Sequence, residues 1–500
     1  MKKILFILAV VMASCQMSAE HDGEAKDADA MKLDTAHFDA MYHMYKEPAL
    51  YHRRFKHADI DTLIRSHESG GVMAVEQIGT SFEGRAIYEL SYGKGEKKVM
   101  LWSQMHGDEP TATMALFDLF NFLSGPDDEF EAVRKLIFSN LELHFIPMLN
   151  PDGAERFFRR NAQQIDLNRD ARVRQTIEGA LLRERARAVN PQYGFNLHDQ
   201  NIYYNVPDTK NPVTISLLAP AFNVEREVNK VRAGAMQLIV GMNRLLQQYV
   251  PDGVAKYDDT HSPRGFGDNF QFWGASTVLI ESGGLKGDPE KQQIRKLNFI
   301  IILNALIEIA EGSYTSYPVD DYDVIPFNAS QLHDVVIRGI KLERDGQGYV
   351  TDIAIRRGEM TVGRDYYVRG RIEDIGDLQD TYGYDEIDAR GYRLIPGKVE
   401  YRAIQSASTL NERSVLSYLK NGVIAVAVKN VGEDRESGLY EWPFILFTKN
   451  QFFPTQTIDL GGTANFFIGD EQGNLKYAVI NGYLVDLSKD VLPRVKNKIF

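Results

Sequence analysis

The chain has a single cysteine, Cys15, among 500 residues. This scarcity excludes an intrachain disulfide, and it means that metal ligands in the folded part of the chain must be histidines or carboxylates. Long basic runs are also missing and the net charge is −12, which argues against nucleic acid as a partner. Beyond the N-terminus no apolar run is long enough to span a bilayer, since the best, residues 299–309, contains Asn304 and Glu308.

Residues 1–14 have the parts of a signal peptide: two lysines, the apolar run Ile4–Met12, and small residues before Cys15. The ending Val11-Met-Ala-Ser-Cys15 resembles a bacterial lipobox, which implies that Cys15 is lipid-modified and anchors the chain to a membrane. Gln16 follows rather than aspartate, which favours the outer membrane of the cell envelope. A secretory signal with an incidental cysteine is the alternative.

The length predicts more than one domain. Residues 15–44 begin with an acidic, alanine-rich stretch and are expected to be a tether. Strands and helices then alternate over residues 45–315. The expected strands are 75–79, 86–91, 98–103, 141–148, 194–198 and 276–280, and the expected helices are 111–123, 175–188, 225–249 and 288–310. This alternation predicts an α/β fold in which helices cover both faces of a mixed sheet.

Chemically reactive residues fall at the ends of these expected strands. His106 and Glu109 are three positions apart in a turn that enters a helix, so both can face one point, as two zinc ligands must. His198 and Glu281 end two later strands. Singly, these residues are also explained as a capped helix start, a buried hydrogen-bonded histidine and a salt-bridge partner. The convergence of several strand ends on one edge of a sheet favours a shared site.

Taken together and in order, these segments resemble the zinc carboxypeptidase family. The matching segments are Gly79–Arg85, His106–Glu109, Asn150–Gly153, Arg159–Asn161, Asp166–Arg169, Asn196–His198 and Val278–Glu281. The resemblance covers roughly residues 45–312. It implies one Zn²⁺ per chain and hydrolysis of the C-terminal peptide bond of peptides with a free carboxylate.

The resemblance also implies a role for each matching residue. His106, Glu109 and His198 correspond to zinc ligands that leave a fourth position for water. Asp166 corresponds to the carboxylate that orients His106, although a surface turn residue is the alternative. Glu281 corresponds to the general base that activates the zinc-bound water and passes its proton to the leaving amine.

Two further pairs of residues concern the substrate. Arg159 corresponds to the arginine that stabilises the developing oxyanion, with its neighbour Arg160 as a rival. Asn168 and Arg169 correspond to the pair that holds the terminal carboxylate, which is the feature that indicates an exopeptidase.

The chain also departs from the digestive enzymes of the family. Asp108 stands where they carry an arginine, so contacts to more distant substrate residues must differ. The mobile tyrosine of the family has three candidates here, Tyr257, Tyr203 and Tyr204, and a core aromatic is the alternative for each. Residues 264–268 lie in the region that determines specificity in the family, but they do not indicate which substrate side chain is preferred.

Residues 316–500 consist of short β-rich runs between glycine, aspartate and asparagine turns, which predicts an antiparallel sandwich or a small barrel. Asp334–Gly339, Val362–Gly397 and Thr463–Leu487 resemble the β-sandwich that flanks amidohydrolase barrels. Because the barrel and its metal-binding histidines are missing, this accessory domain is expected to be non-catalytic. It could position the enzyme, bind a wall polymer or cover one face of the first domain.

The leading hypothesis is therefore a lipid-anchored zinc metallocarboxypeptidase of the bacterial cell envelope. A zinc amidase or deacylase acting on small N-acyl amino acids is the chemical alternative. An inactive envelope binding protein is the third possibility, and the intact Glu281 and complete ligand set speak against it.

Overall fold

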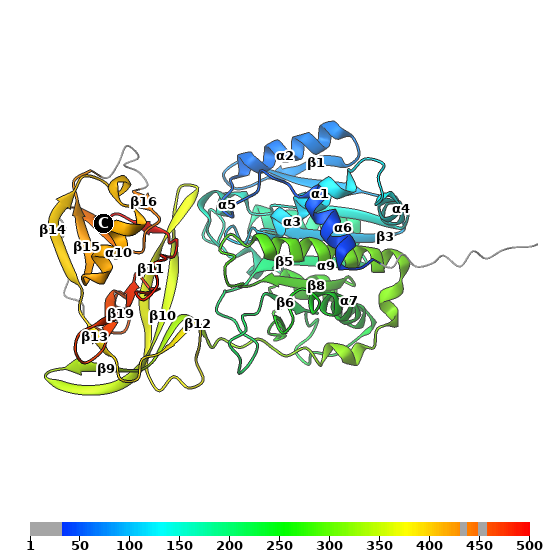
Figure 1. Cartoon of the computed structure of the whole chain (residues 1–500). Coiled ribbons are helices and arrows are strands. Elements are labelled where there is room, and N and C mark those ends of the chain that lie inside the picture. Colours follow the sequence, from blue (N-terminus) through cyan, green and yellow to red (C-terminus); the bar gives the residue numbers. More distant parts are fainter. Residues whose placement is uncertain (1–32, 431–437, 449–457) are drawn as a thin grey trace, which may run out of the picture.

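The computed structural model describes residues 33–430, 438–448 and 458–500. Cys15, the expected signal peptide and most of the expected tether lie outside these residues. Within the described ranges, no helix combines the length and apolar character needed to cross a membrane. The chain forms two parts side by side, an α/β part followed by a β-rich C-terminal part that starts at β9 (Figure 1).

An eight-stranded mixed sheet organises the first part, in the order β1-β2-β4-β3-β5-β8-β6-β7. Its strands are β1 (Ala74–Thr80), β2 (Ala86–Tyr92), β3 (Lys97–Ser103), β4 (Leu141–Ile146), β5 (Tyr193–Asp199), β6 (Ile215–Leu218), β7 (Val254–Lys256) and β8 (Ser276–Ser282). Strands β4, β3, β5 and β8 run parallel, whereas β1, β2 and β6 are joined by antiparallel pairs. The carboxyl ends of β3, β5 and β8 therefore meet at one edge.

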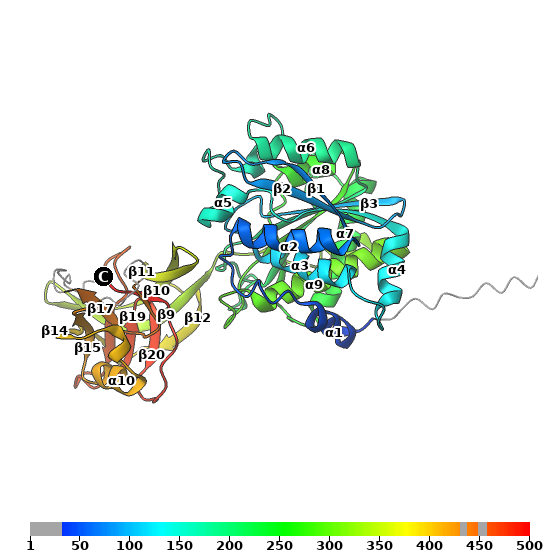
Figure 2. The same cartoon turned by 90° about the horizontal axis from the view of Figure 1, so that it is seen from above.

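Helices cover both faces of this sheet, as predicted (Figure 2). The larger core contains residues of seven of them, and the smaller core contains residues of α6 and α8. The helices are α1 (Thr35–Tyr45), α2 (His57–Gly70), α3 (Thr111–Leu123), α4 (Glu131–Asn140), α5 (Pro151–Arg156), α6 (Ile177–Val189), α7 (Lys230–Leu246), α8 (Phe266–Phe272) and α9 (Gln292–Glu311). Every residue of α3 except Asn121 is buried, because this apolar helix packs between the sheet and α9.

The C-terminal part is rich in β-strands and contains a second large sheet, in the order β11-β10-β9-β13-β18-β19-β20 with β12 paired to β9. Its elements are β9 (Leu332–Arg344), β10 (Gln347–Val362), β11 (Asp365–Gly376), β12 (Tyr382–Asp388), β13 (Arg393–Ile395), β14 (Lys398–Ile404), α10 (Glu412–Lys420), β15 (Val423–Val428), β16 (Leu439–Tyr440), β17 (Ile445–Thr448), β18 (Phe466–Gly469), β19 (Leu475–Ile480), β20 (Tyr483–Asp486) and β21 (Asn497–Lys498). The expectation of antiparallel pairing is wrong for β14, β15 and β17, which pair in parallel. The helix α10 packs on β15, and such a helix is the usual companion of parallel strands.

A buried ion pair joins α3 to α9. Arg295 Nε donates to Asp118 Oδ2 (2.7 Å) and Nη2 donates to Oδ1 (2.5 Å), and both side chains are fully buried. Burial raises the pKa of Asp118 to about 6, although Arg295 opposes this shift. Removing only one partner is therefore expected to destabilise the fold, because it leaves the other charge buried and unpaired.

We expect Arg295→Met to lower the free energy of unfolding by about 3–5 kcal/mol, because Asp118 would stay buried without its partner. Chemical denaturation followed by circular dichroism measures this loss. The matched control is Lys135→Met, which removes an ion pair to Glu131 whose lysine is exposed. This control should cost less than about 1 kcal/mol. An equal loss of unfolding free energy in the two variants would contradict a stabilising role for the buried pair.

Candidate metal centre and active site

The loop between β3 and α3 carries His106 and Glu109, and the start of α5 shapes it. The backbone N–H of Asn150 and its side-chain amide donate to two carbonyls of this loop, at 3.0 and 3.2 Å. A Cβ atom on Gly107 would lie 2.0 Å from the carbonyl carbon of Gly153. Only glycine permits this close approach, so the two loops fix each other.

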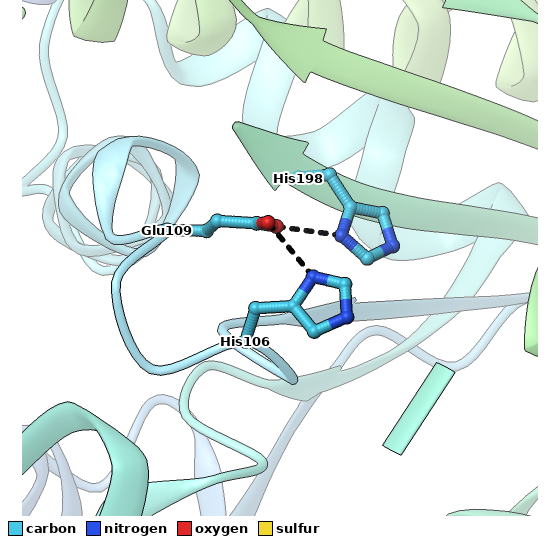
Figure 3. A group of neighbouring side chains, drawn as sticks. All are labelled: His106, Glu109 and His198. Carbon is cyan, nitrogen blue, oxygen red and sulfur yellow. Dashed lines mark hydrogen bonds and ion pairs between the residues drawn. The ribbon is translucent and has the colours of Figure 1, made fainter. Parts of the chain in front are cut away.

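Three buried side chains converge at the edge of the sheet (Figure 3). His106 Nδ1 lies 2.8 Å from Glu109 Oε1, and His198 Nδ1 lies 2.7 Å from Glu109 Oε2. All three candidate ligand atoms lie within 4.8 Å of one another. Burial raises the pKa of Glu109, but the two imidazoles outweigh it and hold that pKa well below its usual range.

The donor set fits a zinc ion. Two imidazole nitrogens and one carboxylate form the ligand set of many catalytic zinc sites, which keep a further position open. The surroundings are acidic as well, because Asp108 and Asp199 each have a buried carboxylate oxygen without a hydrogen-bond partner in the described structure. Burial and the charge of Glu109 raise the pKa of Asp108 to about 6. A divalent cation would offset this concentration of negative charge.

Asp166 orients His106 from the opposite side of the ring. Its Oδ1 lies 3.0 Å from His106 Nε2, so that Nδ1 faces the cluster. The same oxygen accepts the backbone N–H of Asn168 at 2.9 Å. Burial lowers the pKa of His106, but Glu109 and Asp166 raise it to about 9. A carboxylate partner of this kind fixes the orientation of a ligating imidazole.

Glu281 lies beside His198 on the neighbouring parallel strand. The two residues pair in the register of β5 and β8, so their side chains leave the sheet on the same face. The Glu281 side chain is buried. Burial and the negative charges of Glu109 and Asp199 raise its pKa well above the usual value. A carboxyl group with a raised pKa beside a candidate metal centre is suited to proton transfer.

The structure brings Arg159 to the cluster and leaves Arg160 outside it. The guanidinium of Arg159 donates to Asp166 Oδ2 (3.1 Å) and to Glu109 Oε1 (3.0 Å). Arg160 is exposed and donates to the carbonyl of Gln164. Of the two arginines, Arg159 is therefore the one within reach of a group bound at the cluster.

Asn168 and Arg169 lie in a short 3₁₀ turn, Leu167–Arg169. Asn168 Nδ2 is 3.3 Å from His198 Nε2, and its Oδ1 accepts the backbone N–H of Phe266 at 2.9 Å. Arg169 is exposed, and its Nη1 donates to the carbonyl of Asn168 at 2.7 Å. The structure thus places Asn168 at the cluster and Arg169 at its solvent side.

The three candidate tyrosines have different surroundings. Tyr257 and Tyr204 form an edge-to-face pair with ring centroids 5.9 Å apart. Burial raises the pKa of Tyr257, and the charge of Glu281 adds to the shift. The backbone N–H of Tyr257 donates to the carbonyl of Leu217 at 3.2 Å, and the neighbouring Ser216 pairs with Glu281 across β6 and β8. Tyr203 points instead to the C-terminal part, where its hydroxyl bonds to Asp334.

Lys291 joins the two strands that carry His198 and Glu281, and sequence reasoning did not find it. Its Nζ donates to Asp199 Oδ2 (3.0 Å) and to the carbonyl of Ser282 (2.9 Å), and it is buried. The only signal in the sequence is the position of Asp199 directly after His198. No local pattern marks Lys291 itself.

A family model described as zinc carboxypeptidase matches residues 60–199. This part of the chain, from α2 to β5, is similar to zinc carboxypeptidases. The resemblance inferred from the sequence is therefore confirmed for this part of the chain. The zinc carboxypeptidase match includes the three residues of the candidate metal centre, whereas Glu281 lies beyond it.

Curated relatives match short stretches of the chain. The catalytic chain of human carboxypeptidase N is 29% identical over 143 residues, which cover 23% of this chain and 31% of that protein. Carboxypeptidase SOL1 of Arabidopsis thaliana is 39% identical over 99 residues, covering 19% and 20%. An uncharacterized protein of Zymomonas mobilis is 32% identical over 111 residues, covering 22% and 28%. The chain thus spans less than a third of each of these relatives.

The chain is also similar to solved structures over about half of its length. A metallo-carboxypeptidase of Burkholderia cenocepacia has 17% identity and a TM-score of 0.42, covering 51% of this chain and 69% of that one. Carboxypeptidase A of Helicoverpa armigera has 14% identity and a TM-score of 0.42, covering 56% and 80%.

Proposed function

We propose that the protein is a zinc-dependent metallocarboxypeptidase that binds one zinc ion and releases the C-terminal residue of peptides. The observation that carries the proposal is the buried cluster of His106, Glu109 and His198 with Glu281 in register beside it. Zinc held by these three ligands would supply a Lewis acid for the scissile carbonyl and lower the pKa of water.

The side chains of the chain itself divide the remaining work. Glu281 accepts the proton of the attacking water and then delivers it to the leaving amine, which its raised pKa favours. Arg159 donates to the oxyanion that develops on the scissile carbonyl, from its position between Asp166 and Glu109. Asp166 keeps the ring of His106 in place throughout.

Asn168 and Arg169 bind the terminal carboxylate in this proposal. The guanidinium of Arg169 is planar and exposed, so it can form two parallel hydrogen bonds to a carboxylate that enters from solvent. Asn168, beside His198, would contribute a further donor at the same carboxylate. Recognition of a free terminal carboxylate is what restricts the reaction to the end of a peptide.

Peptides with a free C-terminal carboxylate should be cleaved at least about 100-fold faster than the same peptides as C-terminal amides, because an amide cannot accept the charged pair of hydrogen bonds. Arg169→Gln should reduce the ratio of the rate on free acids to the rate on amides, mainly by raising KM for the free acids. The measurement is amino-acid release followed by mass spectrometry. The control is Arg172→Gln, an exposed arginine in the adjacent turn, which should keep the ratio.

Two outcomes would replace the proposal. Rapid hydrolysis of small N-acyl amino acids with little peptide cleavage would make the protein a zinc amidase or deacylase. Stoichiometric ligand binding without turnover of either class would make it an envelope binding protein.

We also propose that lipid on Cys15 anchors the enzyme in a bacterial envelope membrane, on the strength of the lipobox-like ending of residues 1–15. Incorporation of radiolabelled lipid tests this anchor. The parent protein should carry the label and Cys15→Ala should not.

A further inference from the structure

The C-terminal part packs against the chain segments that leave the active-site strands. β10 and β12 lie on its side facing the first part (Figure 1). The segments they meet are those directly after β5, which carries His198, and directly after β8, which carries Glu281. Polar contacts between the two parts occur there and at a second place, where Arg53 and Arg54 pair with Glu359 and Asp59 pairs with Arg364.

Tyr203, five residues after His198, is held by a buried polar network of the second large sheet. Its hydroxyl bonds to the carboxylate of Asp334 and accepts the backbone N–H of Arg357 at 3.0 Å. Arg357 Nη2 in turn donates to Asp334 Oδ1 at 2.6 Å. Tyr203 and Asp334 are 8% and 3% exposed. The network therefore satisfies buried polar groups on both sides of the interface, which makes it costly to break.

Tyr384 of β12 reaches between the two segments. Its hydroxyl donates to the carbonyl of Ile202 at 2.6 Å. On the other side, a Cβ atom on Gly284 would lie 2.2 Å from this hydroxyl. Glycine at position 284, three residues after Glu281, therefore leaves room for a side chain of the C-terminal part. The fit involves the segments after both active-site strands.

The next residue, Tyr204, packs its ring edge-to-face on Tyr257. The backbone N–H of Tyr257 donates to the carbonyl of Leu217, and the residue before Leu217 pairs with Glu281 across β6 and β8. Tyr203 and Tyr204 thus extend from one short piece of backbone to opposite sides, one into the interface and one toward the catalytic carboxylate. Any shift of this backbone would move the pair of tyrosines that borders the site.

We propose that the C-terminal part is a positioning element of the active site, with Tyr203, Asp334, Arg357 and Tyr384 as positioning residues that fix Tyr204 and Tyr257 beside Glu281. The inference rests on the proposed function for its catalytic consequence. Positioning matters because a displacement of about 1 Å can cost up to about 100-fold in rate. The C-terminal part is then required for turnover through its contacts with the segments after β5 and β8.

The full-length chain offers matched variants on the same interface. Tyr203→Phe and Asp334→Asn break the network at the active-site segment. Glu359→Gln, on β10, breaks two other ion pairs, in which Arg53 and Arg54 each donate to Glu359 at 2.7 Å. All three variants should lower the melting temperature. Tyr203→Phe and Asp334→Asn should also lower kcat about tenfold at unchanged zinc content, whereas Glu359→Gln should keep kcat within about twofold of the parent.

Hydrogen exchange gives a second readout that does not depend on turnover. Amides of residues 199–205 and 282–286 should exchange faster in Tyr203→Phe and Asp334→Asn than in Glu359→Gln. The inference is overturned if the three variants match in kcat and in exchange of these segments. If the parent hydrolyses neither peptides nor acyl amino acids, the proposed function fails, and the exchange comparison alone decides the positioning role.

Discussion

Replacing Glu281 with Gln is expected to lower kcat by about 100- to 10,000-fold while the protein still binds one zinc ion. The glutamine has nearly the same shape as glutamate but cannot accept a proton from water, so the step that a general base provides is lost. Steady-state kinetics on a cleaved peptide, together with metal analysis of the same sample, measures both quantities.

Glu308→Gln is the matched control for this variant. Glu308 is as buried as Glu281, at 8% exposure, and it accepts a hydrogen bond from Tyr317 on the far side of α9. Its replacement should leave kcat within about twofold of the parent, since it touches no reacting group. Full activity in Glu281→Gln would remove Glu281 from the mechanism.

The acid side of the pH profile should report the same carboxyl group. Burial and the charges of Glu109 and Asp199 raise the pKa of Glu281. A general base works only when ionised, so kcat/KM should fall as the pH drops through the pKa of Glu281. The residual activity of Glu281→Gln should not show this decrease at low pH.

Removal of the metal is the second change with a large expected effect. Chelation should abolish measurable peptide hydrolysis, and added zinc should restore it, because the proposed reaction depends on the Lewis acid held by His106, Glu109 and His198. Zinc should also raise the melting temperature by several degrees, since a ligand that binds only the folded state stabilises it by mass action. Calorimetry with and without zinc measures this shift.

Two histidine variants test whether zinc binding depends on His198 in particular or on any buried histidine that bonds to a carboxylate. His198→Gln should lose stoichiometric zinc and activity together. His144→Gln is the control, because His144, like His198, bonds to a carboxylate: its ring nitrogens lie 2.9 and 3.0 Å from Glu89 and Glu142. It should retain both. Stoichiometric zinc and full activity in His198→Gln would exclude this residue as a ligand.

Local patterns in the sequence were enough to predict the helix and the strands that carry the candidate site residues. The apolar run that starts after Pro110 predicts residues 111–123 as a helix, and α3 has the same bounds. The predicted strands 194–198 and 276–280 lie within β5 and β8. These elements are long, apolar and bounded by polar loops, so their own residues determine them.

Other features depend on contacts that the sequence does not display. The position of β4 between β2 and β3 follows from long-range pairing. The choice between Arg159 and Arg160 follows from which side chain turns toward Asp166. The short strands β6 and β7 and the amphipathic helix α4 escaped prediction because four, three and ten residues give a weak periodic signal.

The pairing of His198 with Glu281 across β5 and β8 has a consequence for how such an enzyme can diversify. A slip of one residue between these strands would turn one of the two side chains to the opposite face. The spacing of the candidate ligand and the proposed base is thus set by main-chain hydrogen bonds. Loops near the candidate site, such as residues 257–265 before α8, do not set this spacing. Sequence change there can alter which peptides are accepted and leave the hydrolytic chemistry intact.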